Sequence, residues 1–277
     1  MPGIKDFRDK VAVITGAGSG IGRSTALAFA AHGAQLVIAD IREDRLQTVA
    51  GEIEKIGAKS LTRMVDVSDR KQVEDFAGFV IKNCGRVDIL HNNAGVGLGG
   101  PIEISTLKDW EWIVSINFWG VVYGVHYFLP HMIEKRFGHI INTASAAGLS
   151  GLPMLGAYTA TKYAVVGFSE VLRAEVRRHN IGVTALCPGI INTNVVSDGR
   201  QNLPENAKVD QKAMTEFYGK YGWSPDRVAK AALKAVRKNR AVMPVGPEAW
   251  FSWYLKRISI PLNNAILALA VKSALKD

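Results

Sequence analysis

The feature that most constrains the fold is a glycine-rich turn between a short apolar run and a helical pattern. Residues 11–14 are apolar, the turn reads Thr15-Gly16-Ala17-Gly18-Ser19-Gly20-Ile21-Gly22, and a helix is expected over residues 21–31. Glycines without a Cβ atom let backbone N–H groups at a helix N-terminus face a phosphate. A strand, a glycine turn and a helix in this order therefore predict the first unit of a dinucleotide-binding sheet.

Apolar runs alternate with helical patterns along the rest of the chain. We expect strands over residues 11–15, 35–39, 60–65, 87–91, 139–143, 182–187 and 241–245, and further helices over 42–56, 70–84, 107–136, 157–180 and 225–237. Such alternation predicts a parallel sheet covered by helices on both faces. We expect an α/β fold of Rossmann type, with a doubly wound seven-stranded parallel sheet, in a single domain over residues 1–277.

Two segments depart from this regularity. Residues 190–224 are polar and rich in turn residues, which predicts a mobile lid over a binding site. Residues 246–277 form an aromatic and basic C-terminal extension. Ligands of open α/β sheets bind at the carboxyl ends of the strands, so we expect the functional residues at that edge, beneath the lid.

Tyr158 and Lys162 form the second informative pattern. Positions i and i+4 of a helix share one face, so the ammonium should lie beside the phenol and lower its pKa. A free tyrosine has a pKa of about 10, and acid–base work near neutral pH needs a shift of roughly three units, or about 4 kcal/mol. The spacing alone is weak, because a surface tyrosine beside a solvated lysine is the ordinary alternative. Together with the glycine turn it predicts hydride transfer to a carbonyl or from an alcohol.

Further motifs occur in order, and with them the chain resembles the short-chain dehydrogenase/reductase family over residues 8–245. The motifs are Asn92-Asn93-Ala94-Gly95 after the fourth strand, Asn117, Ser145 after Asn142-Thr143-Ala144, the Tyr158/Lys162 pair, and Pro188-Gly189 followed by Thr193. The resemblance implies a catalytic tetrad of Asn117, Ser145, Tyr158 and Lys162. In it the serine binds the substrate oxygen, the tyrosine transfers the proton, the lysine also binds the nicotinamide ribose, and the asparagine holds a water.

The resemblance also implies the cofactor site. Its residues are Gly16, Ser19, Gly20, Ile21, Gly22, Asp40, Asp66, Val67, Asn93, Ala94, Gly95, Tyr158, Lys162, Pro188, Gly189 and Thr193. Asp66 and Val67 resemble the family's adenine contact, although a simple capping aspartate is an alternative for Asp66. No metal site is expected.

Asp40 decides the expected cofactor. It ends the second strand about twenty residues after the glycine turn, where a carboxylate accepts hydrogen bonds from ribose hydroxyls and repels a 2′-phosphate. The alternative is a helix-capping aspartate without a ligand. Arg42 could in principle meet a phosphate, but Ser19 occupies the place where many NADP-preferring relatives carry a basic residue. We therefore expect NAD.

The substrate is less constrained. Apolar residues gather in the lid and in two loops near the site: Val195, Val196, Phe217, Tyr218, Tyr221, Trp223, Val96, Leu98, Leu149, Leu152, Met154 and Leu155. They predict an apolar pocket for a bulky ketone or secondary alcohol, steroid-like, aromatic or aliphatic, although many could be ordinary core. A 3-oxoacyl thioester reductase is an alternative that Asp40 disfavours. A dinucleotide sensor without turnover is another, and the intact tetrad argues against it.

The net charge of +9 is concentrated in the C-terminal part. From Pro225 onward ten lysines and arginines face three carboxylates, a net +7. With Trp250, Phe251, Trp253 and Tyr254, this tail could lie on an anionic membrane surface, but we favour a substrate-pocket or subunit-contact segment. The basic residues form no nucleic-acid reading module, so we expect no nucleic-acid partner.

Cellular context and assembly follow from weaker signals. Cys84 and Cys187 read as reduced, packed thiols, and the N-terminus lacks the apolar core of a signal peptide, so we expect a cytoplasmic protein. No stretch reaches the roughly 20 apolar residues that span a bilayer. The commonest tetrameric relatives end in a strand closing with Gly-Gly, which is absent after Val245. We expect a homodimer through helices 107–136 and 157–180, or else a homotetramer.

Overall fold

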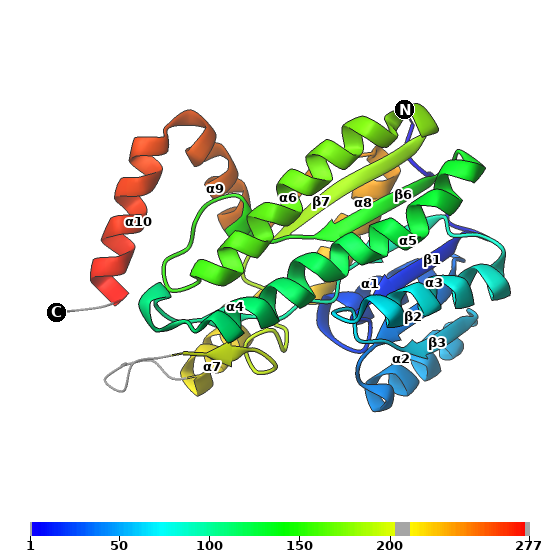
Figure 1. Ribbon diagram of the computed structural model, residues 1–277, viewed down its shortest axis with the longest axis horizontal. Helices are drawn as coiled ribbons and strands as arrows, with labels where there is room; N and C mark the ends of the chain where they lie inside the picture. Colours follow the sequence, from blue (N-terminus) through cyan, green and yellow to red (C-terminus); the bar gives the residue numbers. More distant parts are fainter. Residues whose placement is uncertain (1, 203–210, 275–277) are drawn as a thin grey trace.

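The computed structural model describes residues 2–202 and 211–274, with side chains described up to residue 269, and contains a seven-stranded parallel sheet (Figure 1). Its order is β3-β2-β1-β4-β6-β7-β9. The strands are β1 (Val11–Thr15), β2 (Gln35–Asp40), β3 (Ser60–Met64), β4 (Ile89–Asn92), β6 (Gly138–Thr143), β7 (Ile181–Pro188) and β9 (Val242–Val245). The predicted Rossmann fold is confirmed, and the strand bounds differ from the expected ones by at most two residues. The order reverses between β1 and β4, which opens a crevice at their carboxyl ends.

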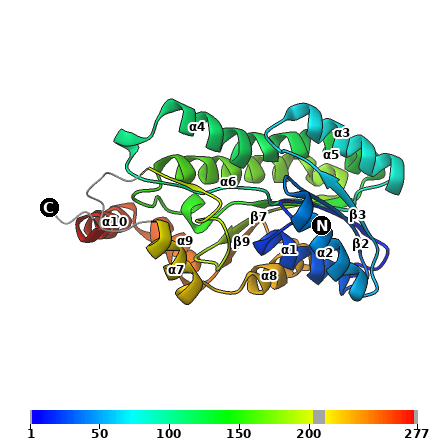
Figure 2. The ribbon, with the colours of Figure 1, turned by 90° about the horizontal axis from the view of Figure 1, so that it is seen from below.

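Helices cover both faces of the sheet, as expected (Figure 2). One layer holds α1 (Gly20–Ala30), α2 (Glu43–Lys55) and α8 (Pro225–Lys238), and the other holds α3 (Arg70–Cys84), α5 (Gly120–Lys135) and α6 (Gly156–Val176). Successive side chains of β1 point to opposite faces, so Ile14 packs with Phe29 of α1 while Val13 packs with Phe76 of α3. A strand buried on both faces reads as a continuous apolar run, which is why the sequence located these strands well.

The helix expected over residues 107–136 is interrupted. It consists of α4 (Leu107–Val114), a π-helical turn (Ser115–Trp119) and α5, in one continuous rod of 29 residues. By length and mean hydropathy (1.2) this rod is one helix that could cross a membrane, although polar and charged residues interrupt it and no run of about 20 apolar residues occurs in it. Its buried face, with Val125, Phe128 and Met132, packs in the core against α3 and the sheet.

Some elements of the expected lid and of the C-terminal extension were not expected from the sequence. Within 190–224 the structure has β8 (Arg200–Gln201), parallel to β5 (Leu98–Gly99), and α7 (Gln211–Tyr221); residues 203–210 of the expected lid lie outside the described residues. The extension forms α9 (Pro247–Ile258) and α10 (Ile260–Ala274), an arm that extends from the body of the sheet (Figure 1). Lys276 and the side chain of Lys272 lie outside the described part. Cys84 and Cys187 are free thiols, as predicted.

Candidate functional site

A cavity of about 700 Å³ lies at the carboxyl ends of the central strands, between the glycine turn and the segment after β7. It is lined by sixteen of the residues that the sequence singled out: Gly16, Ser19, Gly20, Ile21, Asp40, Asp66, Val67, Asn93, Ala94, Gly95, Ser145, Tyr158, Lys162, Pro188, Gly189 and Thr193. Gly22 and Asn117 do not line it, but both contact residues that do. We call its two ends the Asp40 end and the Tyr158 end.

The glycine turn is held close to the loop after β4. Gly16 has φ +62°, and a Cβ on it would lie 2.7 Å from Ala94 Cα, so a side chain would be strained and would clash. The Asn93 amide donates to the carbonyl oxygens of Thr15 and Gly16, each at 3.1 Å. A Cβ on Gly22 would meet the Gly16 carbonyl and this same amide. The motif after β4 therefore fixes the turn that lines the cavity.

Asp40 is bound to the glycine turn. Its Oδ2 accepts a hydrogen bond from Gly18 N at 2.8 Å, and its Oδ1 accepts one from Arg42 N at 3.0 Å. Arg42 occupies the N-cap position of α2, so Asp40 is not the cap of that helix. The carboxylate thus holds the start of α2 against the turn and lines the cavity between them.

Asp66 plays a local role besides lining the cavity. Its Oδ1 accepts hydrogen bonds from Ser68 N at 2.9 Å and from Ser68 Oγ at 2.7 Å. The cap of α3 is Asp69, whose side chain accepts from Lys71 N and Gln72 N. The alternative of a capping aspartate at position 66 is therefore wrong for α3. Asp66 stabilises the turn before that helix.

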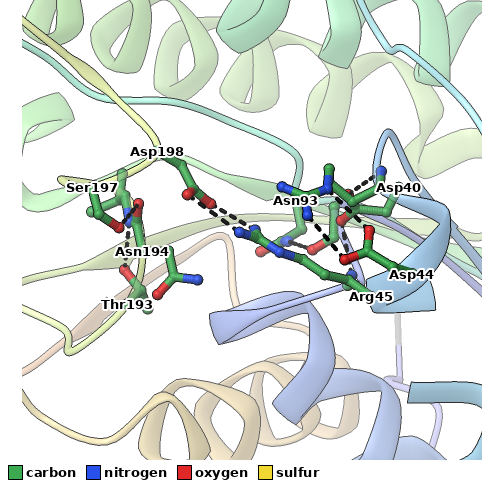
Figure 3. A network of polar contacts seen from close by, with 12 residues as sticks. Asp40, Asp44, Arg45, Asn93, Thr193, Asn194, Ser197 and Asp198 are labelled. Carbon is green, nitrogen blue, oxygen red and sulfur yellow. Dashed lines mark hydrogen bonds and ion pairs between the residues drawn. The ribbon is translucent and has the colours of Figure 1, made fainter. Parts of the chain in front are cut away.

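Two arginines at the Asp40 end carry ion pairs. Arg42 contacts Asp44 of its own helix, with Nη2–Oδ2 at 2.9 Å. Arg45 contacts Asp198, with Nη1–Oδ2 at 2.7 Å (Figure 3). Three of these residues, Arg42, Arg45 and Asp198, line the cavity. Asp198 comes from the segment after β7, and no short motif marks it in the sequence.

At the Tyr158 end, burial is the main cause of the pKa shifts of the ionisable side chains. Burial raises the pKa of Tyr158 to about 12, against a smaller lowering by a hydrogen bond with Ser145. Burial also lowers the pKa of Lys162 to about 8. Lys162 Nζ lies 5.6 Å from the Tyr158 ring centroid and donates to the Thr143 carbonyl at 3.1 Å. The prediction that the lysine lowers the tyrosine pKa was wrong for this arrangement, because desolvation of the phenol outweighs the more distant ammonium.

The π-helical turn of the long rod presents Asn117 to the loop after β4. Its Nδ2 donates to the Val96 carbonyl at 2.9 Å, and its Oδ1 accepts from Val96 N at 2.8 Å. A Cβ on Gly95 would lie 3.1 Å from Asn117 Oδ1 and 3.3 Å from Lys162 Nζ. Gly95 therefore leaves room for both groups. The prediction placed Asn117 in a continuous helix, whereas a π turn, common at functional sites, positions it.

The cavity wall at the Tyr158 end is largely apolar, as predicted. The expected residues that line it are Val96, Leu98, Leu152, Leu155, Val195, Val196 and Tyr218. Leu149, Met154, Phe217, Tyr221 and Trp223 do not line it, and Leu149 is part of a buried core cluster. The sequence missed Trp112, Ile116, Gln201, Met214, Glu248 and Ser252, which also line the wall. Most of these are single residues without a motif, and only the fold brings them together.

Two contacts hold the segment after β7, residues 189–202, which borders the cavity. Arg200 lies over the Trp112 ring at 4.0 Å and faces the Asp109 carboxylate at 3.5 Å, which ties β8 to α4. Glu248, in the first turn of α9, accepts a hydrogen bond from Ile190 N at 2.8 Å. The extension therefore does contribute to the cavity, through Glu248 and Ser252. The aromatic residues Trp250, Phe251, Trp253 and Tyr254 do not line it, so the expected pocket role was wrong for them.

The model of the short chain dehydrogenase family matches residues 10–204. The chain belongs to the short chain dehydrogenase family. It is 40% identical to the putative oxidoreductase SadH of Mycobacterium tuberculosis, over 97% of each chain. It is 36% identical to levodione reductase of Leifsonia aquatica, over 86% of this chain and 93% of that protein. The probable oxidoreductase EphD of Mycobacterium tuberculosis is 38% identical over 91% of this chain, which spans only 43% of EphD's length.

Solved structures agree with this membership. A short-chain dehydrogenase/reductase from Burkholderia phymatum in complex with NAD superposes with a TM-score of 0.84 at 34% identity, covering 94% of this chain and 96% of that chain. The crystal structure of levodione reductase superposes with a TM-score of 0.77 at 34% identity, covering 88% and 99%. These superpositions support the family membership and the fold of the chain.

Proposed function

We propose that the protein uses NAD(H) to interconvert a bulky apolar secondary alcohol and its ketone. The observation that carries the proposal is the shared cavity, which has Asp40 at one end and Ser145, Tyr158 and Lys162 at the other. The levodione reductase relative supports ketone reduction, and the NAD complex of the Burkholderia phymatum relative supports the cofactor. The cofactor preference of this chain rests on Asp40.

The residues present fit a dinucleotide. The glycine turn leaves a cradle that a Cβ on Gly16 or Gly22 would fill, and Asp40 offers a carboxylate beside it. In this arrangement Asp40 would hold the adenosine ribose, and the turn would hold the pyrophosphate. Pro188, Gly189 and Thr193 would border the nicotinamide. When bound, the dinucleotide supplies or accepts the hydride.

The chain's own residues supply the proton and its setting. Tyr158, with its pKa near 12, is protonated at neutral pH and is therefore set to donate from its phenolic oxygen during ketone reduction. Ser145 lowers the pKa of that phenol and lines the same cavity, where it would orient the substrate oxygen toward the phenol. Lys162 is held by the Thr143 carbonyl beside the ring. The apolar wall excludes water from the reacting atoms.

A turnover screen tests this proposal. Purified protein is assayed with NADH and NADPH against steroid, aromatic and aliphatic ketones and a 3-oxoacyl thioester. We expect reduction of at least one bulky apolar ketone, with kcat/KM for NADH at least about tenfold above that for NADPH, because one charge-assisted hydrogen bond is worth about 1.5–3 kcal/mol. Preference for NADPH would contradict the cofactor proposal. Turnover of the thioester alone would contradict the substrate proposal.

A further inference from the structure

The Asp40 end of the cavity contains a contact that joins two distant parts of the chain. Arg45 is the third residue of α2, and Asp198 lies in the segment after β7. The two residues are 153 positions apart in the sequence. Two hydrogen bonds connect them, Nη1–Oδ2 at 2.7 Å and Nη2–Oδ1 at 3.4 Å. Figure 3 shows the Arg45 side chain extending past Asp40 toward the Asp198 carboxylate. The guanidinium of Arg45 therefore uses two of its N–H donors to bind a residue of the segment after β7.

Arg45 and Asp40 flank the same point of the glycine turn. A Cβ built on Gly18 would lie 2.8 Å from Arg45 Cβ and 2.9 Å from Asp40 Oδ2. Any group bound to Asp40 therefore lies beside the Arg45 stem, within reach of its guanidinium after a rotamer change. The hydrogen bond with Asp198 raises the pKa of Arg45, and the nearby Asp40 charge raises it further.

A phosphate would compete for this arginine. Guanidinium groups bind phosphates through two parallel hydrogen bonds, and a 2′-phosphate on a ribose at Asp40 would meet Arg45 directly. Arg45 must first give up its bonds to Asp198, and the Asp198 carboxylate repels the same phosphate. Arg42 is held in a similar way by Asp44, but both partners there lie on one helix, with side chains 54% and 64% exposed. The Arg45–Asp198 pair is less exposed, at 27% and 45%, so water screens it less.

We propose that Asp198 is a positioning residue that favours NAD over NADP by holding Arg45, in addition to the direct effect of Asp40. The inference rests on the proposed function, which places the adenosine ribose at Asp40. It assigns part of the cofactor preference to the segment after β7, far in sequence from the glycine turn and the second strand.

Equilibrium binding to the full-length protein tests the inference, with titration calorimetry of NAD and NADP at one ionic strength. Asp198→Asn keeps the size of the side chain and removes its charge. We expect the Kd for NADP to fall by about five- to tenfold, the scale of a partly exposed ion pair plus the lost repulsion. The Kd for NAD should change by less than about twofold. If Asp198 only anchored the segment after β7, the Kd values for NAD and NADP would change together, and that result would overturn the inference.

Four further variants separate the causes: Arg45→Ala, its combination with Asp198→Asn, Asp6→Asn and Asp198→Glu. In an Arg45→Ala background, Asp198→Asn should change the NADP/NAD ratio of Kd values less than it does in the wild-type background, because only the direct repulsion of the phosphate is then lost. An undiminished effect there would show that Asp198 does not act through Arg45. Asp6→Asn is the charge-matched control, because Asp6 pairs with Arg8 on an exposed surface away from the cavity. If Asp6→Asn lowered the Kd for NADP equally, the effect of Asp198→Asn would be explained by the change in net charge alone. Asp198→Glu should retain the wild-type preference if the carboxylate is what matters.

The outcome for Asp198 is independent of the outcome for the cofactor proposal. If the wild-type protein bound NADP more tightly than NAD, the assignment of NAD would fail. The coupling between Arg45 and Asp198 would still be read from how the ratio changes across the four variants of the cycle. Absence of that coupling overturns the inference whichever cofactor the wild type prefers.

Discussion

At the Tyr158 end of the cavity the polar groups are buried, whereas at the Asp40 end they are partly in water. Ser145 and Lys162 are 9% and 4% exposed, while the side chain of Asp198 is 45% exposed. At the buried end, desolvation moves the pKa of Tyr158 to about 12 and that of Lys162 to about 8. At the other end, pairing dominates, and the pKa of Arg45 is raised mainly by its hydrogen bond with Asp198.

This difference indicates how each end responds to change. A buried polar group that loses its partner keeps its full desolvation cost, so one substitution has a large effect that salt barely screens. An exposed ion pair is worth roughly 0.2–1 kcal/mol and weakens as salt rises. Under the proposed function, substitutions at the buried end should therefore change turnover strongly, while substitutions at the exposed end should change the NAD/NADP preference in smaller steps.

The largest effect is expected from Tyr158→Phe at the buried end. The substitution removes the proton donor and keeps the ring, so turnover should fall by at least about 10²-fold, the low end of general acid–base contributions. Calorimetry should show a Kd for NAD within a few-fold of wild type, because the phenol contributes little to holding the dinucleotide. A phenylalanine variant with nearly wild-type turnover would show that the two ends do not divide the work in this way.

Asp40→Ala tests the exposed end directly. It removes the acceptor for the ribose hydroxyls and the repulsion of a 2′-phosphate, and one charge-assisted hydrogen bond is worth about 1.5–3 kcal/mol. The ratio of kcat/KM for NAD over NADP should fall by about tenfold or more. Asp44→Asn removes the ion-pair partner of Arg42. It should change the NAD/NADP ratio less than Asp40→Ala does, because the Arg42 side chain is more exposed to water than that of Arg45. An unchanged ratio in Asp40→Ala would remove the basis for the cofactor proposal.

The third prediction concerns pH, because His91 lies directly behind the buried end. Its Nε2 is 2.8 Å from Thr143 Oγ1, and burial lowers its pKa to about 3. Below pH 6.5 the unfolded chain binds a proton there that the native protein excludes until about pH 3. His91 should therefore contribute a loss of stability as pH falls through that window, with a slope approaching about 1.4 kcal/mol per pH unit from this one group.

Urea unfolding at several pH values measures this slope. His91→Gln removes the titrating group, so its unfolding free energy should depend less on pH than that of wild type between pH 6 and 4. Equal slopes in the two proteins would show that His91 does not control acid stability. A loss of structure at every pH would be recognised by circular dichroism before the comparison is made.

The smallest effect is expected where the extension meets the cavity. Glu248→Ala removes the acceptor for Ile190 N and should loosen the segment after Pro188, which borders the expected nicotinamide position. Because a single hydrogen bond contributes about 1 kcal/mol, we expect KM for NAD to rise about three- to fivefold with kcat changed less. Glu248→Gln keeps an acceptor oxygen and should stay within about twofold of wild type. Equal effects of the two variants would point to charge rather than to this hydrogen bond.

The extension shows where sequence reasoning stopped. The aromatic run after Val245 predicted a pocket or contact segment, yet Glu248 and Ser252 reach the cavity while Phe251 and Tyr254 are exposed. Successive residues of a helix are rotated by about 100° around its axis, so neighbouring residues point in different directions. Composition alone therefore could not say which face of α9 meets the site. The subunit assembly that would cover these side chains stays a prediction.

The sheet and the residues that belong to short motifs could be predicted from local sequence patterns. Strands buried on both faces are apolar runs, the glycine turn needs residues without Cβ atoms, and Tyr158 and Lys162 share a helix face, so local rules place all of them. The tertiary structure alone decided the pairing of Arg45 with Asp198, the brace from Glu248 and the direction of the Tyr158 pKa shift. These depend on burial and on contacts between residues up to 153 positions apart, which no local pattern encodes.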